Sequence, residues 1–179
     1  MSSLLNITPI DGRYKSKVKE LESFFSEYAF FKYRIFVEIK YLLFLSEQGI
    51  ISEILQEDKI KINNIYENFD LNECEKIKDI ERKTNHDVKA IEYYIKDKIC
   101  ESATSTDNLT NMVHFGLTSQ DVNSSANILM IKDSIGNVIL PLLNGLSNEF
   151  NNISEKWMVI PLLSKTHGQT ATPTTFGKE

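Results

Sequence analysis

The three histidines of the sequence all lie in short polar clusters rather than within apolar helical stripes. His86 lies in a Thr-Asn-His-Asp sequence and His167 in Thr-His-Gly-Gln. His114 is separated by one residue, Phe115, from the sequence Gly-Leu-Thr-Ser. Histidine is the side chain most easily set to give or take a proton near neutral pH. These placements favour proton transfer or ligand binding. For each cluster alone, a turn histidine that only completes local hydrogen bonds is the competing interpretation.

The stretch around His167, residues 164–173, also holds hydroxyls, an amide and a cation. Thr172 is suited to cap a helix and Pro173 to occupy its first position, so we expect an ordered loop here that leads into a new helix. Gly168 would let the backbone approach a ligand closely. The pattern predicts an imidazole presented on a loop between two helices.

His86 falls at the junction of two predicted helices, because the apolar periodicity stops at Thr84 and resumes at Val88. Free N–H groups and the positive end of the dipole attract anions to a helix N-terminus, and the same dipole disfavours a charged imidazole. We therefore expect His86 to act as a neutral hydrogen-bonding group. Thr118 opens another predicted helix, with Asp121 three residues later in a position to reach back to it.

The N-terminal segment is rich in turn-forming residues and places Arg13 beside Tyr14. A guanidinium suits bidentate contact with a carboxylate or phosphate, and a phenol offers a stacking face and a hydroxyl. Local sequence alone favours the plainer interpretation of an Arg in solvent and a Tyr against the core.

Two common catalytic designs do not fit this sequence. Zinc sites need tight spacings such as H-E-x-x-H or paired cysteines, and neither is present. A serine hydrolase would need a G-x-S-x-G elbow within an alternating strand and helix pattern, which is also missing. We expect no metal ligands.

The elements that must position these clusters are predicted to be helices throughout. Residues 16–48 contain neither Gly nor Pro, with a main helix expected from Ser26-Glu27 to a stop at Gly49. An apolar stripe from Ile128 to Trp157 predicts a long helix kinked near Pro141. No strand alternation is evident, so the sequence predicts an all-α fold. The turn-rich residues 102–107 suggest a subdomain over residues 1–106 and the start of a long-helix bundle over 107–179.

Composition excludes several classes of protein. The 179 residues are 41% hydrophobic and 25% charged, which is typical of a soluble globular chain. A net charge of −5 argues against a nucleic-acid partner. The first residues lack a signal-peptide pattern, and no uninterrupted apolar run is long enough to span a bilayer, so we expect no membrane partner. The last residues carry no helix stop, which suggests a piece of a longer protein.

Four motifs, taken together and in this order, resemble the adenylosuccinate lyase family, bacterial-type branch, of the fumarase/aspartase superfamily. They are Pro-Ile-Asp-Gly-Arg-Tyr at 9–14, Thr-Asn-His-Asp-Val-Lys-Ala at 84–90, His-Phe-Gly-Leu-Thr-Ser-Gln-Asp at 114–121 and Thr-His-Gly-Gln at 166–169. The resemblance extends from about Ile7 to the end of the chain. Gln120 and Thr170 depart from residues common in the family, at peripheral positions.

The resemblance implies a β-elimination that breaks a C–N bond and releases fumarate, in purine nucleotide biosynthesis, without a metal or organic cofactor. It implies that His167 is the general acid and that His86 orients the substrate. Substrate-binding roles are implied for the following residues: Arg13, Tyr14, Asn85, His86, Asp87, Thr118, Ser119, Thr166 and Gln169. The role of His114 is left open, with a structural role favoured.

The resemblance also implies a cytoplasmic homotetramer in which subunits share active sites. The base of this family is a serine in a downstream Gly-Ser-Ser-x-Met-Pro-x-Lys loop, which this sequence does not contain, so we expect the chain alone to be inactive. Two alternatives stay open: a non-catalytic helical scaffold that binds a ligand, and another lyase of the superfamily such as argininosuccinate lyase. The Asp-Gly-Arg-Tyr and Asn-His-Asp sequences argue against the second.

Overall fold

A computed structural model describes residues 5–103 and 108–179 of the chain. Its internal contacts divide the chain into two compact units, Met1–Ser134 and Ile135–Glu179, which are treated separately below. The subdomain boundary predicted between residues 106 and 107 lies outside the described residues and stays a prediction.

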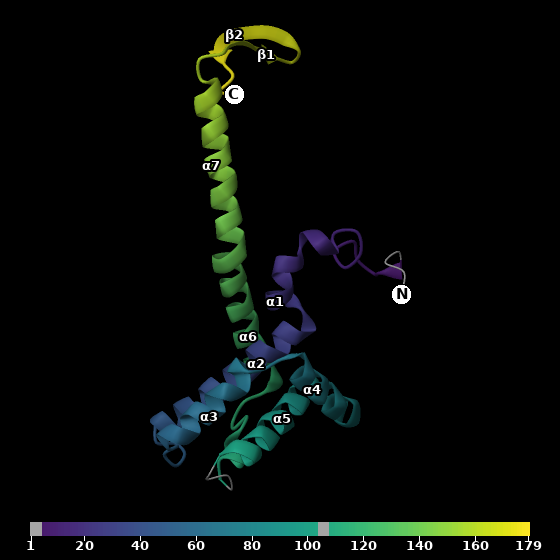
Figure 1. The fold of residues 1–179 in the computed structure, drawn as a ribbon, viewed down its shortest axis with the longest axis vertical. Coiled ribbons are helices and arrows are strands. Elements are labelled where there is room, and N and C mark those ends of the chain that lie inside the picture. The colour runs from purple at the N-terminus through teal and green to yellow at the C-terminus, as the bar shows by residue number, and fades with distance from the viewer. Residues whose placement is uncertain (1–4, 104–107) are drawn as a thin grey trace. The chain divides into compact units, whose positions relative to one another are not determined.

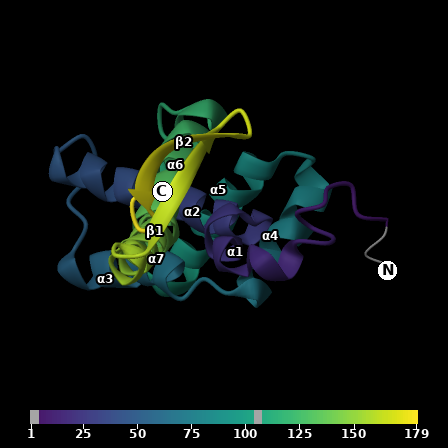
Figure 2. The same ribbon diagram turned by 90° about the horizontal axis from the view of Figure 1, so that it is seen from above.

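The first unit is helical, as the apolar periodicity predicts. Its elements are the short 3-10 turns Lys15–Lys17, Lys19–Leu21 and Thr110–Met112 and the helices α1 (Glu22–Phe25), α2 (Glu27–Glu47), α3 (Gln56–Glu67), α4 (Leu71–Thr84), α5 (Asp87–Ser102) and α6 (Ser119–Ser134). Helix α2 packs against α3, α4, α5 and α6, and is the element around which this unit is built (Figure 1). The view from above shows α4 and α5 together on one flank of α2 (Figure 2).

Local sequence sets the ends of α2 where they are predicted. The Ser26 hydroxyl accepts a hydrogen bond from the Ala29 N–H at 3.1 Å, which satisfies one of the free donors at the helix start. Gly49 follows the helix with a φ of +69°, a left-handed conformation that a residue without Cβ adopts at little cost. Helix α4 begins in the same way, because the Asp70 carboxylate accepts from the Glu73 N–H at 2.9 Å.

The core of the first unit forms where one face of α2 meets α3, α4 and α5. Its largest fully buried apolar side chains are Phe31, Ile35, Ile39, Leu42, Ile62, Ile77, Ile91, Ile95 and Ile99. Burying each such side chain contributes about 1.5–3 kcal/mol. Polar contacts at the edge fix the pairing of helices: the Tyr28 hydroxyl donates to the Phe69 carbonyl at 2.7 Å, and the Tyr94 hydroxyl donates to Glu73 at 2.9 Å.

The second unit begins with a π-helical turn, Ile135–Ile139, followed by helix α7 (Leu140–Trp157). The sequence predicts the irregularity at Pro141, and the structure places it just before that residue. Pro141 closely follows this turn within the continuous helical stretch Ser119–Trp157, and its missing N–H leaves one intrahelical bond unmade, which favours an irregularity at this place. The π-helical turn is the local distortion that accommodates Pro141 in the helix.

The prediction of a helix that starts at Thr172-Pro173 is wrong. The all-α prediction holds for the described chain except for one small two-stranded sheet. Residues 161–175 form an antiparallel hairpin of β1 (Pro161–Thr166) and β2 (Gln169–Thr175). The β-branched threonines of β2 favour this conformation. Pro173 is tolerated because it pairs with Leu163 beside an irregularity in the register.

The turn of the hairpin explains the Gly next to His167. His167 and Gly168 form the two-residue connection, with φ values of +51° and +77°. Positive φ at both central positions is the mark of a type I′ turn, whose twist matches that of the flanking strands. The imidazole therefore lies on a hairpin turn and not on a loop between helices.

Aromatic and backbone contacts join the hairpin to the end of α7. The rings of Trp157 and Phe176 meet edge to face with centroids 6.0 Å apart. The Gly177 N–H donates to the Trp157 carbonyl at 3.0 Å. A Cβ added to Gly177 would lie 2.2 Å from the Ser154 carbonyl oxygen and 2.6 Å from the Met158 Cα, so this position has no room for a side chain.

One long helical stretch bears on the expectation that the protein has no membrane partner. Within the described part of the chain, the helical stretch Ser119–Trp157 is long and apolar enough to cross a membrane by length and composition, and most of its apolar window is exposed. It is not an uninterrupted apolar run, because polar residues lie among its leucines and isoleucines. A bundle helix of a soluble protein passes the same test. The exposed apolar residues of α7 include Leu142, Leu143, Leu146 and Phe150.

Candidate active site

A pocket of about 360 Å³ lies in the first unit, between α2 and the junction of α4 with α5. Its lining residues are Glu27, Phe30, Phe31, Arg34, Glu81, Asn85, His86 and Asp87. The four residues from α2 recur at three- and four-residue spacings and therefore share one face of that helix. The opposite wall is the cluster that the sequence singles out around His86.

The backbone at the junction presents His86 as the cap of α5. Asn85 ends α4 with a φ of +50°, and His86 then adopts an extended conformation. His86 Nδ1 accepts a hydrogen bond from the Lys89 N–H at 3.1 Å. An acceptor nitrogen carries no proton, so Nε2 holds the ring hydrogen and can donate to a ligand. The side chain is half exposed, which leaves Nε2 accessible.

Asp87, the first residue of α5, is paired with Arg34 from the middle of α2. One guanidinium nitrogen of Arg34 lies 2.8 Å from Asp87 Oδ2. Burial alone would raise the pKa of Asp87, but the Val88 N–H and the Arg34 charge outweigh it and hold that pKa below its usual value. Asp87 is therefore an ionised acceptor at neutral pH.

The charges in the pocket are mixed rather than of one sign. Glu27 of α2 and Glu81 of α4 both line the pocket with Arg34, and Lys78 bridges the two carboxylates at 2.7 Å to each. Carboxylates, one guanidinium and two aromatic rings from α2 form the lining. Such a lining offers acceptors for the hydrogen-bond donors of a ligand and aromatic faces on which a flat group can stack.

The start of α6 is closed by its own carboxylate, as the spacing predicts. Thr118 donates to Asp121 Oδ2 through its N–H at 2.8 Å and through its hydroxyl at 3.1 Å. The backbone bond from Thr118 is the main reason that the pKa of Asp121 is lowered. Thr118 and Ser119 thus lie at a helix terminus that already binds a carboxylate oxygen within the chain. Neither residue lines the pocket around His86.

His114 makes a contact that sequence reasoning did not find. Its Nδ1 is hydrogen-bonded to Oε1 of Glu38, a side chain of α2 with no exposed surface. Tyr41, one turn further along α2, donates its hydroxyl to the Phe115 carbonyl at 3.1 Å. These contacts tie the turn before Thr118 to α2. Glu38 gives no signal in the sequence, since it lies between Ile35 and Ile39 in an apolar stripe.

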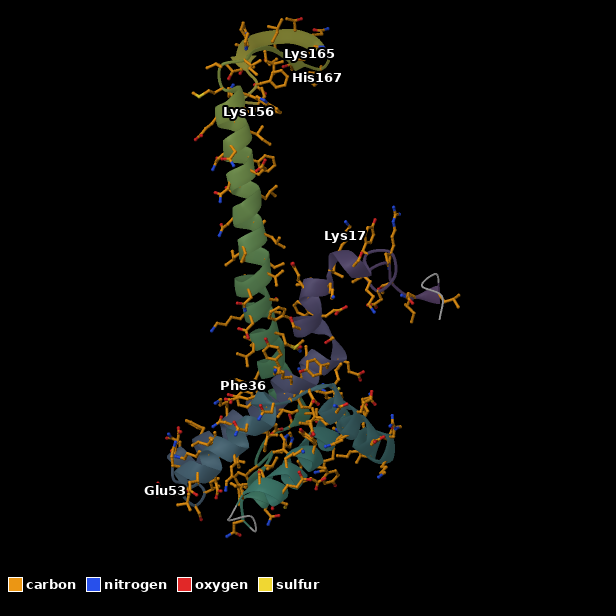
Figure 3. All side chains as sticks on the ribbon, in the orientation of Figure 1. Lys17, Phe36, Glu53, Lys156, Lys165 and His167 are labelled. Atoms are coloured by element: carbon orange, nitrogen blue, oxygen red, sulfur yellow. The ribbon has the colours of Figure 1, made fainter. Side chains whose placement is uncertain are left out.

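The other predicted site residues lie elsewhere. Tyr14 is fixed by a 2.9 Å bond from its N–H to the Pro9 carbonyl, and the Arg13 guanidinium lies 5.4 Å from the Tyr14 ring centre; both side chains are exposed and neither lines the pocket. His167 and its neighbours Thr166 and Gln169 are exposed at the hairpin of the second unit, where Figure 3 shows His167 beside Lys165. The structure thus gathers Asn85, His86 and Asp87 in the pocket, and the other predicted site residues of the first unit do not line it.

The three polar clusters share a backbone feature. Over residues 5–103 and 108–179, the non-glycine residues with positive φ are Asn85, His114 and His167. Such conformations cost free energy and tend to occur where function requires them. The same described residues hold no group of three or more His, Cys, Asp or Glu side chains suited to a metal ion.

Comparison with known proteins shows the family to which the chain belongs. A sequence model of the family described as "Lyase" matches residues 12–179. The chain therefore belongs to this lyase family. Among solved structures, it resembles a fumarate lyase from Mesorhizobium sp. BNC1 (TM-score 0.70, 19% identity, 89% of this chain and 35% of that one). It also resembles a beta-carboxy-cis,cis-muconate cycloisomerase from Acinetobacter calcoaceticus sp. ADP1 (TM-score 0.67, 16% identity, 89% and 36%).

Closer relatives by sequence carry one name. The chain is 42% identical to the "Adenylosuccinate lyase" of Dictyostelium discoideum over 100% of its own length and 40% of that relative. It is 45% identical to the protein of that name from Buchnera aphidicola subsp. Baizongia pistaciae (99% and 39%). It is 41% identical to that from Escherichia coli K12 (100% and 40%). The chain thus spans about 40% of the length of these relatives.

Proposed function

We propose that the full-length gene product is an adenylosuccinate lyase and that this chain supplies part of its active site. The observation that carries the proposal is the 42% identity to a protein of that name across the whole chain. The pocket adds support, because the Asn-His-Asp cluster of the sequence lines it with an accessible imidazole.

The proposed reaction is a β-elimination that breaks a C–N bond. A base removes a proton from the succinyl carbon next to the one that bears nitrogen, the electron pair of that C–H bond forms the double bond of fumarate, and the nitrogen leaves with a proton from an acid. Adenylosuccinate would give AMP, and succinyl-aminoimidazole-carboxamide ribotide would give its carboxamide, in purine nucleotide biosynthesis. His167 is the proposed acid. The base comes from outside this chain.

Binding roles follow the chemistry of each cluster. Arg13 and Tyr14 would hold the nucleotide at its phosphate, since a guanidinium binds phosphate oxygens in pairs. Thr118 and Ser119 would hold a succinyl carboxylate at the start of α6, in competition with Asp121, whose carboxylate accepts from Thr118 in the absence of substrate.

The residues near the two catalytic histidines would orient the reacting groups. Asn85, His86 and Asp87 would contact the nucleotide and succinyl group in the pocket, with His86 Nε2 as a donor. Thr166 and Gln169 would contact the substrate beside His167. No step requires a metal or an organic cofactor.

Assembly is part of the proposal. The full-length protein would be a cytoplasmic homotetramer with shared sites and no nucleic-acid or membrane partner, and the exposed apolar face of α7 would pack in the helical bundle rather than in lipid. This chain alone would be inactive.

The test is fumarate release, followed by proton NMR, from adenylosuccinate supplied to the purified full-length gene product. Turnover supports the proposal. Turnover of argininosuccinate in its place would identify the rival lyase, and absence of turnover with both would favour a non-catalytic scaffold. A homogeneous 1–179 chain, assayed in parallel, should release none.

A further inference from the structure

Arg34 is a charged residue in the core of the first unit. Only 4% of it is exposed, although it lies in the pocket wall. Its guanidinium carbon is 3.5 Å from the centre of the Phe30 ring, so the planar group stacks on that aromatic face. Its Nε is buried and has no hydrogen-bond partner within the described residues.

Such a residue is costly for the fold. Burial lowers the pKa of Arg34, because removal from water disfavours the charged form, and the Asp87 carboxylate only partly offsets this. A well-packed apolar side chain would often serve stability as well as a buried ion pair. The presence of a guanidinium at this site therefore needs a reason other than packing.

The ion pair that Arg34 forms points to that reason. It holds Asp87, which is itself nearly half exposed and begins α5. The residue before Asp87 is His86, whose Nδ1 is committed to the Lys89 N–H in the same helical turn. Fixing Asp87 consequently fixes this turn, and with it the direction of His86 Nε2. A rigid, stacked guanidinium does this better than a flexible ammonium.

We propose that Arg34 is a positioning residue for the reaction: through Asp87 it holds the first turn of α5 so that His86 Nε2 meets the substrate in a fixed orientation. The inference rests on the proposed function and assigns to α2 a part in it. Arg34 itself need not touch substrate, because its effect passes through Asp87.

The activity test compares Arg34→Met and Arg34→Lys in the full-length gene product. Arg34→Met keeps the volume and loses the pairing. Since misplacement by about 1 Å can cost about 100-fold, we expect kcat/KM for adenylosuccinate to fall about 100-fold, with Arg34→Lys intermediate. Tyr33→Phe is the matched control, because Tyr33 is adjacent to Arg34 in α2. Its hydroxyl is hydrogen-bonded to Asp133 at the far end of α6, at 2.8 Å. Loss of this bond should leave kcat/KM near the wild-type value.

A double-mutant comparison distinguishes an effect of Arg34 that passes through Asp87 from a general weakening of the fold. If Arg34 acts through Asp87, the Arg34→Met/Asp87→Asn enzyme should be no slower than Asp87→Asn alone. Losses that multiply in the double variant would overturn the proposal. So would wild-type kcat/KM in Arg34→Met.

A structural readout keeps the inference testable if Arg34→Met does not fold or if the wild type shows no lyase activity. In Asp87→Asn, which breaks the same pair from its exposed side, amide hydrogen exchange at Lys89 should be about tenfold faster. Exchange at Glu73, held by the comparable cap of α4, should not change. Unchanged exchange at Lys89 overturns the positioning role. Absence of fumarate release by the wild type would refute the proposed function alone.

Discussion

The Glu38 carboxyl group is buried in the middle of α2, and its hydrogen-bond partner is the imidazole of His114, a residue with a φ of +65° in the turn before α6. Glu38 Oε2 is also buried and finds no partner among the described residues. A buried acid with one partner depends strongly on that partner. The pair therefore ties the start of α6, which carries Thr118 and Ser119, to the central helix.

His114→Asn should destabilise the chain by about 3 kcal/mol at pH 7, because it leaves the Glu38 carboxyl buried without its partner. Asn is chosen because it tolerates positive φ, so backbone strain does not contribute. Burial already raises the pKa of Glu38, against the influence of His114. A raised pKa in the folded state means stability that is present at low pH and lost as pH rises.

Loss of His114 raises the pKa of Glu38 further, so the deficit of His114→Asn should grow as pH rises above 4.5, the ordinary value of a glutamate. Urea unfolding of wild type and variant at several pH values measures it. Glu38→Gln/His114→Asn removes the acid and should lose this pH dependence. A deficit that is the same at every pH would contradict the role given to Glu38.

Two substitutions of His86 should separate its cap from its chemistry. His86→Ala removes the acceptor for the Lys89 N–H and should cost about 1 kcal/mol, which thermal unfolding detects. His86→Asn restores a good cap and should unfold near the wild-type temperature. In the full-length protein both should lose about 100-fold or more in activity, since neither offers Nε2. Activity in the Asn variant would show that the cap alone matters.

His167→Asn should abolish most activity without disturbing the hairpin. Asn-Gly is the preferred sequence of a type I′ turn, so the fold of residues 161–175 is kept while the proton donor is lost. We expect kcat to fall by about 100- to 10,000-fold. Circular dichroism and thermal unfolding should match the wild type. Retained activity would remove His167 from the catalytic step.

His86 and His167 belong to different compact units and are separated in the chain by α5, α6 and α7. We expect that they serve one active site from different subunits of the proposed tetramer. Inactive full-length His86→Ala and His167→Ala proteins, mixed, dissociated and reassembled, should regain part of the wild-type activity. Each mutant alone, taken through the same steps, should stay inactive. If mixed tetramers are confirmed by mass and activity does not return, this assignment is wrong.

Glu73 should control acid stability of the pair α4 and α5. Burial would raise its pKa, but Lys76, Tyr94 and Lys98 outweigh burial and lower it to about 2. Its contribution is present above the ordinary value of 4.5 and is lost as pH falls toward about 2. The difference in unfolding temperature between wild type and Glu73→Gln should shrink over that range. Glu75→Gln, at an exposed position on α4, is the matched control for removing one glutamate charge from this helix.

Sequence patterns predicted most of the helical scaffold because caps act locally. Ser26 and Asp70 each bind a backbone N–H three residues away, and such signals are readable in the sequence. The predicted position of His86 at a helix junction is confirmed for the same reason. The hairpin was missed because Thr172-Pro173 satisfies the rules for a helix start, while the pairing of Leu163 with Pro173 depends on residues ten apart.

Buried charge is what the sequence did not reveal. Arg34 and Glu38 lie four residues apart in α2, among apolar residues, and each acquires its role only from a partner far along the chain, Asp87 and His114 respectively. Periodicity predicts which face of α2 is buried. It does not predict which charged residues are buried together with that face, because their burial depends on tertiary packing.

The end of α7 bears on how variation along this chain should be interpreted. Gly177 has backbone atoms where any Cβ would lie, so the hairpin that carries His167 closes onto α7 only with glycine there. In a library that samples every amino acid at every position, only glycine would be tolerated at position 177, which would therefore resemble a catalytic residue. The intolerance of this position to substitution would reflect the close backbone contact between Gly177 and the end of α7. Genetic essentiality at this position is therefore no guide to chemistry.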